Sequence, residues 1–178
     1  ASIEVMQHRR EELSDRTKQA LELLNDEVVR FEHLVQDLLD LSRSDSGPME
    51  NDLVNIEELV KATLELTEGQ VSFEVIGTAR GALVMGDKRR LAQVLDNLLR
   101  NAEKYGGGAT RITIASDGGK IEVAVEDSGP GVAPSEQSLI FERFTRGAAA
   151  RKRGAGDGAG LGLALVDEHA RRHGGSAR

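Results

Sequence analysis

The first part of the chain has the pattern of an amphipathic helix. Its apolar positions follow the spacing of one helical face: Leu24, Val28, Phe31, Val35 and Leu38, with Leu21, Leu34 and Leu41 beside them. A stripe this broad is typical of a helix packed in a bundle. Ser14 or Asp15 can cap this helix, so residues 1–12 are expected to end an earlier one. A hairpin of two such helices predicts pairing with a second copy into a four-helix dimer.

The pattern changes after the turn-forming stretch 44–48, which contains Gly47 and Pro48. Beyond it, the apolar spacing predicts a helix over 55–66, strands at 71–76 and 82–85, a helix after Asp87, a hairpin of strands 110–115 and 120–126, and a last helix over about 160–173. Because strict β–α–β alternation is absent, we expect an α+β fold, a two-layer α/β sandwich with a largely antiparallel sheet. The expected domains are a helical one at 1–46 and a mixed one at 47–178.

Composition and charge narrow the classes of protein. The chain has 178 residues, a formal net charge of −7, no cysteine and only 3% aromatic residues. The lack of cysteine excludes disulfides, thiolate zinc sites and cysteine nucleophiles, and the acidic balance argues against nucleic-acid binding. No apolar run reaches the roughly 18–20 residues of a transmembrane helix, and no signal peptide opens the chain. Because it starts at Ala1 and stops soon after a Gly-Gly pair, we interpret the chain as a fragment.

Glycines gather near the C-terminal end. Six of the 20 fall between residues 147 and 162 and lead into an amphipathic helix that starts near Leu161. Glycine lets backbone N–H groups approach an anion, and a helix N-terminus attracts phosphate, so the stretch favours a phosphate site. A flexible loop that only caps a helix is equally consistent with it. Residues 154–159 also match the dinucleotide pattern G-x-G-x-x-A, but they follow the basic run 151–153 rather than a buried strand, which excludes that interpretation.

Two other stretches carry candidate chemistry. Asp127 stands at the end of a predicted strand, before a tight Gly-Pro-Gly turn, where a carboxylate can accept a hydrogen bond from an amine such as N6 of adenine. Asn97, Asn101 and Lys104 fall on one face of the preceding helix, and an Asn carbonyl is a suitable ligand for Mg²⁺. Taken alone, an ordinary Asp-Ser-Gly turn and surface asparagines explain both stretches as well.

In this order, the stretches resemble the catalytic ATP-binding domain of bacterial sensor histidine kinases. Residues 87–105 resemble its N box, 126–132 its G1 box, 140–144 its F box and 158–163 its G2 box. Residues 30–43 resemble the second helix of the dimerisation and histidine-phosphotransfer domain. The resemblance implies the Bergerat-type ATP-binding fold shared by DNA gyrase, Hsp90, histidine kinases and MutL, preceded by an α-helical dimerisation hairpin.

The resemblance also implies roles for single residues. Asn101 is expected to coordinate Mg²⁺ on the triphosphate, Asn97 to line that pocket and Lys104 to lie near the phosphates, and these three are the candidate catalytic residues. Asp127 is expected to accept a hydrogen bond from N6 of adenine, over which Tyr105 lies. The candidate ATP-binding residues are Asn97, Asn101, Lys104, Tyr105, Asp127, Gly129, Gly131, Phe144, Arg146, Gly158, Gly160, Leu161 and Gly162.

The activity implied is transfer of the γ-phosphoryl group of ATP to a histidine, and then to an aspartate of a response regulator. The family's acceptor motif, His-Glu-x-x-Thr-Pro, surrounds none of the four histidines, so we expect the chain to bind ATP without phosphorylating itself. His169 and His173 are expected on a polar face of the last helix rather than at a metal. Ala159 stands where the G2 box commonly has Ser or Thr, and the domain's final hairpin is expected to be missing after Arg178.

The partners implied are ATP with Mg²⁺, a cognate response regulator and a second copy joined through residues 1–46. The fragment is expected in the cytoplasm, attached to a membrane only through upstream segments of its parent protein. Two alternatives stay open. An anti-sigma serine kinase of the same fold would lack the long helix over 21–43, and a non-catalytic dimerisation module would not bind nucleotide.

Overall fold

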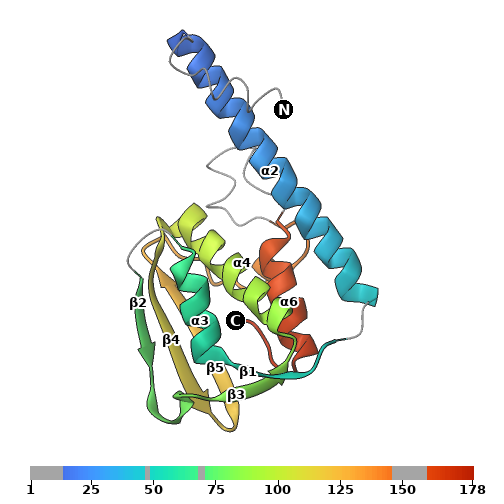
Figure 1. Ribbon diagram of the computed structural model, residues 1–178, viewed down its shortest axis with the longest axis vertical. Coiled ribbons are helices and arrows are strands. Elements are labelled where there is room, and N and C mark those ends of the chain that lie inside the picture. Colours follow the sequence, from blue (N-terminus) through green and yellow to red (C-terminus); the bar gives the residue numbers. More distant parts are fainter. Residues whose placement is uncertain (1–13, 47–48, 68–70, 146–159) are drawn as a thin grey trace. The chain divides into compact units, whose positions relative to one another are not determined.

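The computed structural model describes residues 14–46, 49–67, 71–145 and 160–178, and the chain divides into two compact units, residues 1–43 and 44–178. The described part begins with helix α2 (Asp15–Ser46; Figure 1). The Ser14 hydroxyl oxygen accepts a hydrogen bond from the Thr17 backbone N–H at 3.3 Å. This contact satisfies a backbone donor that the first turn leaves free, so the predicted cap is confirmed. The prediction of an earlier helix over 1–12 lies outside the described residues.

Helix α2 has a long exposed apolar surface. Among its described side chains, seven large hydrophobic ones are exposed: Leu23, Leu24, Val28, Val29, Phe31, Val35 and Leu39. Apolar area left in water has a free-energy cost of roughly 25 cal/mol per Å², so a stripe of this size favours a partner surface. The stripe contains four of the eight positions from which the sequence predicts a bundle helix.

The second unit contains every element that the pattern predicts beyond the linker. In chain order its elements are β1 (Asp52–Asn55), α3 (Ile56–Glu65), β2 (Ser72–Val75), η2 (Gly77–Ala79), β3 (Leu83–Gly86), α4 (Lys88–Gly106), β4 (Ala109–Asp117), β5 (Lys120–Asp127), η3 (Leu139–Phe141) and α6 (Gly162–Arg172). Among the described elements, the pattern missed strand β1 and the short 3-10 helices η2 and η3. Strand β1 has a physical reason for being missed. It is four residues long and buries only Val54, which is too little for a period of two to be visible.

The strands form two sheets rather than one. Strands β4 and β5 pair antiparallel, and β2 joins the other edge of β4 in parallel. Strands β1 and β3 form a separate antiparallel ribbon. Two of the three described strand pairs are antiparallel, as the prediction of a largely antiparallel arrangement requires, and the pair of β2 with β4 is parallel. The parallel pair is possible because β3 and α4 lie between these strands in the chain, and a connection of that length can cross over.

The hairpin of β4 and β5 has a local cause in the sequence. Its turn consists of Gly118 and Gly119, which have φ angles of 55° and 79°. Two successive residues with positive φ match the turn that joins twisted antiparallel strands, and glycine adopts this conformation without steric cost.

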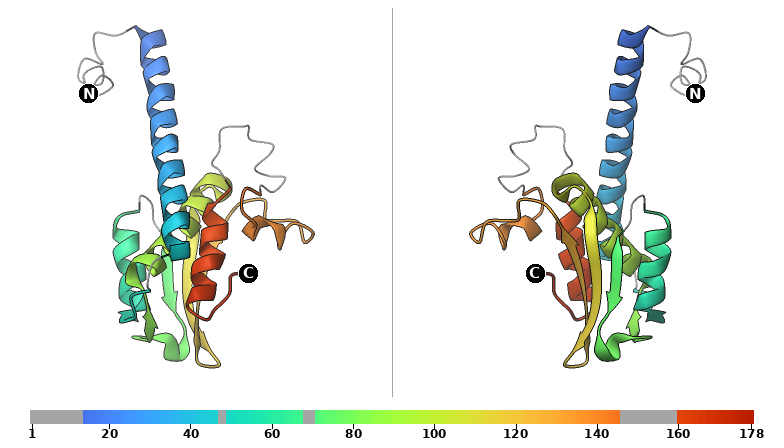
Figure 2. Two further views of the ribbon diagram at one scale, coloured as in Figure 1. Left: turned by 90° about the vertical axis from the view of Figure 1, so that its right-hand side faces the viewer. Right: turned by 90° about the vertical axis from the view of Figure 1, so that its left-hand side faces the viewer.

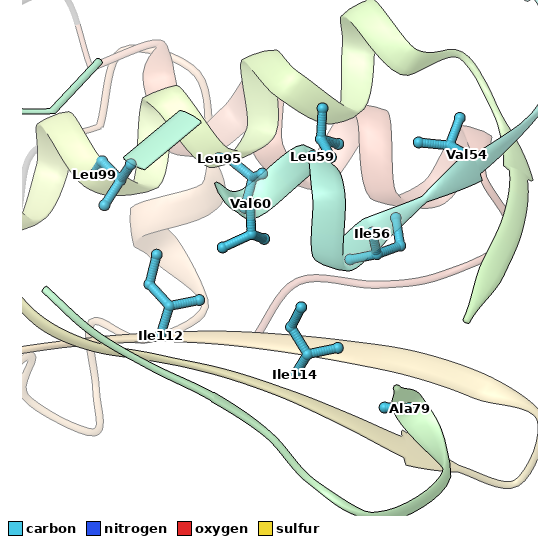
Figure 3. Close-up of a cluster of buried hydrophobic side chains, with 9 residues drawn as sticks. All are labelled: Val54, Ile56, Leu59, Val60, Ala79, Leu95, Leu99, Ile112 and Ile114. Carbon is cyan, nitrogen blue, oxygen red and sulfur yellow. The ribbon is translucent and has the colours of Figure 1, made fainter. Parts of the chain in front are cut away.

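The core of the second unit lies between the helices and the three-stranded sheet (Figure 3). Ile112 and Ile114 project from β4 and are fully buried. They face apolar side chains of α3 and α4, namely Ile56, Leu59, Val60, Leu95 and Leu99. Figure 1 shows α3, α4 and α6 beside this sheet, and Figure 2 shows α4 next to α6 from two further sides. The two-layer arrangement of the predicted α+β fold is thus confirmed.

Among the described residues, no helix combines the length and the apolar character that crossing a membrane requires.

Candidate functional site

Helix α4 is the platform of the site. Its N-terminus is capped by the Asp87 carboxylate, which accepts hydrogen bonds from the N–H groups of Arg89 and Arg90 at 3.0 and 3.3 Å. Its C-terminus ends at Gly107, which has a φ of 71° and so adopts the left-handed conformation of a helix stop. Both ends are therefore specified by local sequence.

The predicted polar residues of α4 lie between these ends. Asn97 is buried, with 6% of its surface exposed, whereas Asn101 and Lys104 are half-buried. The Lys104 ammonium lies 5.6 Å from the centroid of the Tyr105 ring, which is a cation–π distance. Exposure thus increases from Asn97 to Asn101 and Lys104, which is consistent with the prediction that the three residues share one face of α4.

Asp127 meets the C-terminal end of α4. One of its carboxylate oxygens accepts a hydrogen bond from the Gly129 N–H at 2.7 Å. A Cβ at Gly106 would lie 2.4 Å from this carboxyl group, and a Cβ at Gly129 would lie 2.9 Å from the Tyr105 carbonyl oxygen. Only glycines permit so close an approach of the helix end and the loop. The Asp127 carboxylate remains exposed, so a ligand can reach it.

The N-terminus of α6 forms the opposite end of the site. Gly160 has a φ of 71°, and its carbonyl oxygen accepts a hydrogen bond from the Phe144 N–H at 3.0 Å. A Cβ at Gly160 would lie 2.7 Å from the Thr145 carbonyl oxygen, so the backbone is packed closely there. Leu161 is buried and anchors the first turn, and no described side chain caps the helix. The first N–H groups of α6 are thus positioned for an anion.

The two helices come together at Asn97. A Cβ on Gly162, the first residue of α6, would lie 3.2 Å from the Asn97 side-chain oxygen. The Asn97 amide nitrogen is buried and has no hydrogen-bond partner among the described residues. Leaving a buried donor unpaired costs about 1–3 kcal/mol, and an acceptor-rich ligand would remove that cost. A buried donor beside an uncapped helix N-terminus fits the phosphate groups of a nucleotide.

The other predicted site residues are Gly131, Phe144, Arg146 and Gly158. Gly131 lies in the exposed loop after β5 with a φ of 71°, and a Cβ there would meet no atom of the described residues within 4 Å. Phe144 also has a positive φ, 63°, and 65% of its surface is exposed. Arg146 and Gly158 lie outside the described residues.

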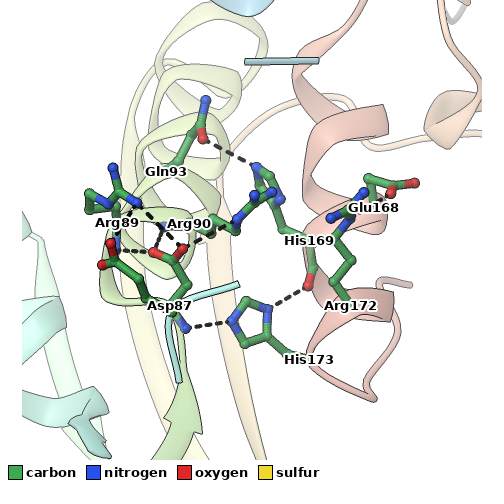
Figure 4. Close-up of polar contacts among 9 residues, drawn as sticks. Asp87, Arg89, Arg90, Gln93, Glu168, His169, Arg172 and His173 are labelled. Carbon is green, nitrogen blue, oxygen red and sulfur yellow. Dashed lines mark hydrogen bonds and ion pairs between the residues drawn. The ribbon is translucent and has the colours of Figure 1, made fainter. Parts of the chain in front are cut away.

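One feature beside the site was not found from the sequence. His169 and His173 face α4 rather than solvent, so the expectation of a polar surface face is wrong for His169, of which only 1% is exposed (Figure 4). Its ring N–H donates to the Gln93 side-chain oxygen at 3.2 Å. The second ring accepts a hydrogen bond from the Asp87 N–H at 3.0 Å. Among the described residues there is also no group of three His, Cys, Asp or Glu side chains that could hold a metal.

The surroundings of this cluster shift the pKa values of His169 and Asp87. Burial, followed by the nearby positive charge of Arg90, lowers the pKa of His169 to about 4. Burial alone would raise the pKa of Asp87, but hydrogen bonds from backbone N–H groups, first that of Arg90, lower it below its usual value. Neutral His169 and ionised Asp87 are therefore the forms that the fold favours near neutral pH.

Comparison with known families decides the class. A family model described as "Histidine kinase-, DNA gyrase B-, and HSP90-like ATPase" matches residues 86–178, more than half of the chain. The chain belongs to this family. The matched range begins before the cap of α4 and extends to the end of the chain, so this ATPase domain includes both ends of the site described above.

Individual relatives place the ATPase domain among the sensor histidine kinases. The signal transduction histidine-protein kinase/phosphatase MprB of Mycobacterium ulcerans (strain Agy99) is 38% identical over 165 residues, covering 88% of this chain and 31% of the relative. Full-length ShkA, solved in complex with AMPPNP, has a TM-score of 0.63 and 28% identity over 89% of this chain and 34% of that chain. The histidine kinase ThkA, solved in complex with the response regulator protein TrrA, has a TM-score of 0.61 and 25% identity over 87% and 50%.

These comparisons confirm the resemblance to sensor histidine kinases, the Bergerat-type fold and the ATP-binding core. The chain spans about a third of the length of the curated relatives that it matches.

Proposed function

We propose that this chain is the catalytic ATP-binding core of a sensor histidine kinase and transfers the γ-phosphoryl group of ATP to a histidine in two-component signalling. The proposal rests on a pair of features beside and on α4. The exposed carboxylate of Asp127, the last residue of β5, lies against the C-terminal end of α4, and the buried Asn97 amide, which has no hydrogen-bond partner among the described residues, lies beside the start of α6. ATP has an amine on its base and anionic phosphates at its other end, so its chemistry matches both features.

At the base end, Asp127 accepts a hydrogen bond from N6 of adenine. The Gly129 N–H holds one carboxylate oxygen in place, and the carboxylate is exposed to a ligand. Gly131 shapes the same loop, and Tyr105 lies over the base. Guanine has a carbonyl oxygen where adenine has this amine, so a carboxylate there discriminates against guanine nucleotides.

At the phosphate end, the N–H groups at Gly160, Leu161 and Gly162 bind phosphate oxygens. The absence of a side-chain cap on α6 and the unpartnered nitrogen of Asn97, both among the described residues, support this placement. Lys104 adds positive charge. Phe144, Arg146 and Gly158 are proposed as further nucleotide contacts on the resemblance alone.

Asn101 is the proposed ligand of Mg²⁺. It lies one turn after Asn97 on α4 and offers an amide oxygen of the kind that Mg²⁺ accepts. The ion, when bound, neutralises phosphate charge during phosphoryl transfer. The half-buried position of Asn101 leaves room for the water ligands that Mg²⁺ usually keeps.

Asn97 favours phosphoryl transfer over hydrolysis. The resemblance places a glutamate of the fold's hydrolases at this position, where a carboxylate takes a proton from water. An amide cannot take that proton. The anti-sigma kinase alternative is disfavoured by the long helix α2, and a non-catalytic module is the alternative that nucleotide binding tests.

Two macromolecular partners belong to the proposal. The solved complex of ThkA with TrrA supports a response regulator as a partner of this chain. The exposed apolar stripe of α2 supports a second copy joined through residues 1–46, because pairing two such stripes removes them from water. The parent protein is proposed to be attached to a membrane through segments outside this chain.

Calorimetric titration tests the nucleotide assignment. Mg-ATP should bind in preference to Mg-GTP, and Asp127→Ala should weaken ATP by roughly 1–3 kcal/mol, the cost of an unpaired buried donor, while leaving GTP unchanged. The control is Asp117→Ala, which removes an exposed carboxylate at the opposite end of the same hairpin. Removing Mg²⁺ with a chelator should weaken ATP. Equal ATP and GTP affinities, unaffected by Asp127→Ala, would refute the adenine assignment.

A transfer assay separates the kinase from the interaction module. With γ-labelled ATP, a separate chain that carries a His-Glu-x-x-Thr-Pro helix should gain an acid-labile, base-stable label. Asn101→Ala should abolish that label without unfolding the domain, because Asn101 is not in the core. Nucleotide binding without transfer to any acceptor would favour the non-catalytic module.

A further inference from the structure

Three contacts join α4 and α6 in antiparallel order. Along α6, Gly162 approaches Asn97, His169 binds Gln93 and His173 binds the N–H of Asp87 (Figure 4). The helical rise from residue 162 to residue 173 is about 16 Å along α6, and from residue 97 back to residue 87 it is about 15 Å along α4. The two helices therefore cover nearly equal lengths between the first contact and the last. His173 therefore connects one end of the helix pair, while the phosphate end of the proposed site lies at the other.

The ring of His173 is held by both of its nitrogens. The His169 carbonyl oxygen, 2.7 Å from Nδ1, can only accept, so Nδ1 carries the hydrogen. The Asp87 backbone nitrogen, 3.0 Å from Nε2, can only donate, so Nε2 keeps its lone pair. The Nδ1–H donation stays within α6, whereas the Nε2 acceptor is the link to α4.

The chain leaves space for this ring at Gly86. A Cβ on Gly86 would lie 2.5 Å from His173 Cδ2 and 2.8 Å from Nε2, distances that real Cβ atoms do not show. Gly86 has no positive φ, so its backbone alone does not require glycine. The close approach of the ring does require it.

We propose that His173 is a positioning residue for the nucleotide site: its Nε2 fixes the end of α6 to the cap of α4 and thereby sets the spacing at which Gly162 meets Asn97. The inference rests on the proposed nucleotide site, because it concerns that site's geometry. A helix is stiff over three turns, so a change at its C-terminal contact displaces its N-terminal phosphate-binding end. Asp87 thus has two roles: its backbone N–H donates to the His173 ring, and its side-chain carboxylate caps α4.

A matched pair of amide variants separates the two ring contacts. In His173→Gln the side-chain oxygen lies the same number of bonds from Cβ as Nε2, so it can still accept from the Asp87 N–H. In His173→Asn the side-chain nitrogen matches Nδ1 and keeps only the donation within α6. If the contact with α4 positions the nucleotide site, His173→Asn should weaken Mg-ATP binding about tenfold, the effect of one lost hydrogen bond. His173→Gln should keep an affinity near that of the parent chain. A role limited to ending the helix predicts the opposite order.

Gly86→Ala tests the same link without altering His173, because the new methyl group displaces the ring. It should also weaken Mg-ATP about tenfold, and the double variant with His173→Asn should lose no more than either single one, since both break one contact. Arg171→Ala is the control: it removes an ion pair with Asp167 within α6 that does not involve α4. Retained ATP affinity in folded Gly86→Ala would overturn the proposal.

Nuclear magnetic resonance on the parent chain gives a readout that does not depend on nucleotide. Ring nitrogen shifts should report the Nδ1–H form of His173, and the Asp87 amide should be protected from hydrogen exchange in the parent and in His173→Gln but not in His173→Asn. If the parent fails to bind ATP while this pattern is present, the proposed function fails and the link stands. An Nε2–H ring, or an unprotected Asp87 amide in the parent, refutes the link whatever the nucleotide does.

Discussion

Acidification should destabilise this domain through His169. The side chain is 1% exposed and is packed between α6 and α4, where Arg90 adds positive charge. A second positive charge on the buried ring would be both desolvated and repelled. The folded chain therefore keeps the ring neutral, and its pKa falls from the usual 6.5 to about 4.

The size of the effect follows from this pKa. Between about pH 6.5 and pH 4 the unfolded chain binds a proton at His169 that the folded chain does not bind. The free energy of unfolding is therefore fully retained above this window and falls as the pH is lowered through it, by at most about 1.4 kcal/mol per unit. From pH 7.5 to pH 5 the loss amounts to about 2 kcal/mol.

Urea unfolding, followed by circular dichroism at several pH values, measures this loss. The comparison is with His169→Gln, which keeps a polar group near Gln93 but cannot take the proton. Other titrating groups are common to both chains and cancel in the difference. The stability difference should change by about 2 kcal/mol between pH 7.5 and pH 5. Parallel curves for the two chains over this range would refute the assignment of the buried neutral ring.

Three further outcomes are expected. Gly162→Ala places a methyl group about 3.2 Å from the Asn97 oxygen and should weaken Mg-ATP about tenfold by calorimetry, with little change in melting temperature. Ile112→Ala removes a fully buried side chain and should lower the free energy of unfolding by about 2–5 kcal/mol in urea titrations. Phe144→Gly should raise it by up to about 1 kcal/mol, because an exposed side chain there has a φ of 63°; a loss of thermal stability would mean that the ring packs.

Much of the fold could be predicted because its causes are local. The cap of α2 at Ser14, the cap of α4 at Asp87 and the glycine turn between β4 and β5 each depend on contacts within a few residues. Apolar periodicity likewise placed α3 and α6. The candidate ATP-binding residues could also be identified from the sequence, because family motifs are runs of neighbouring residues.

The pairing of segments that lie far apart in the chain could not be predicted from the sequence in this way. The parallel alignment of β2 with β4 depends on a crossover through β3 and α4, and β1 buries too little to show a pattern. The burial of His169 is a further case. By helical spacing it is a polar residue on an amphipathic helix, and only the packing of α4 against that helix makes it a core residue.

The sequence by itself therefore determined most of the elements and the caps of α2 and α4, because short-range hydrogen bonds and periodicity specify these. Its motifs, which are runs of neighbouring residues, likewise pointed to the family and to the candidate ATP contacts. The tertiary structure alone decided which backbone groups meet across the domain: Gly162 with Asn97, Gly106 and Gly129 with Asp127, and the ring of His173 with Gly86 and the N–H of Asp87. Such contacts depend on the register of two packed helices and a loop, which is set by the whole core and by no single stretch of residues.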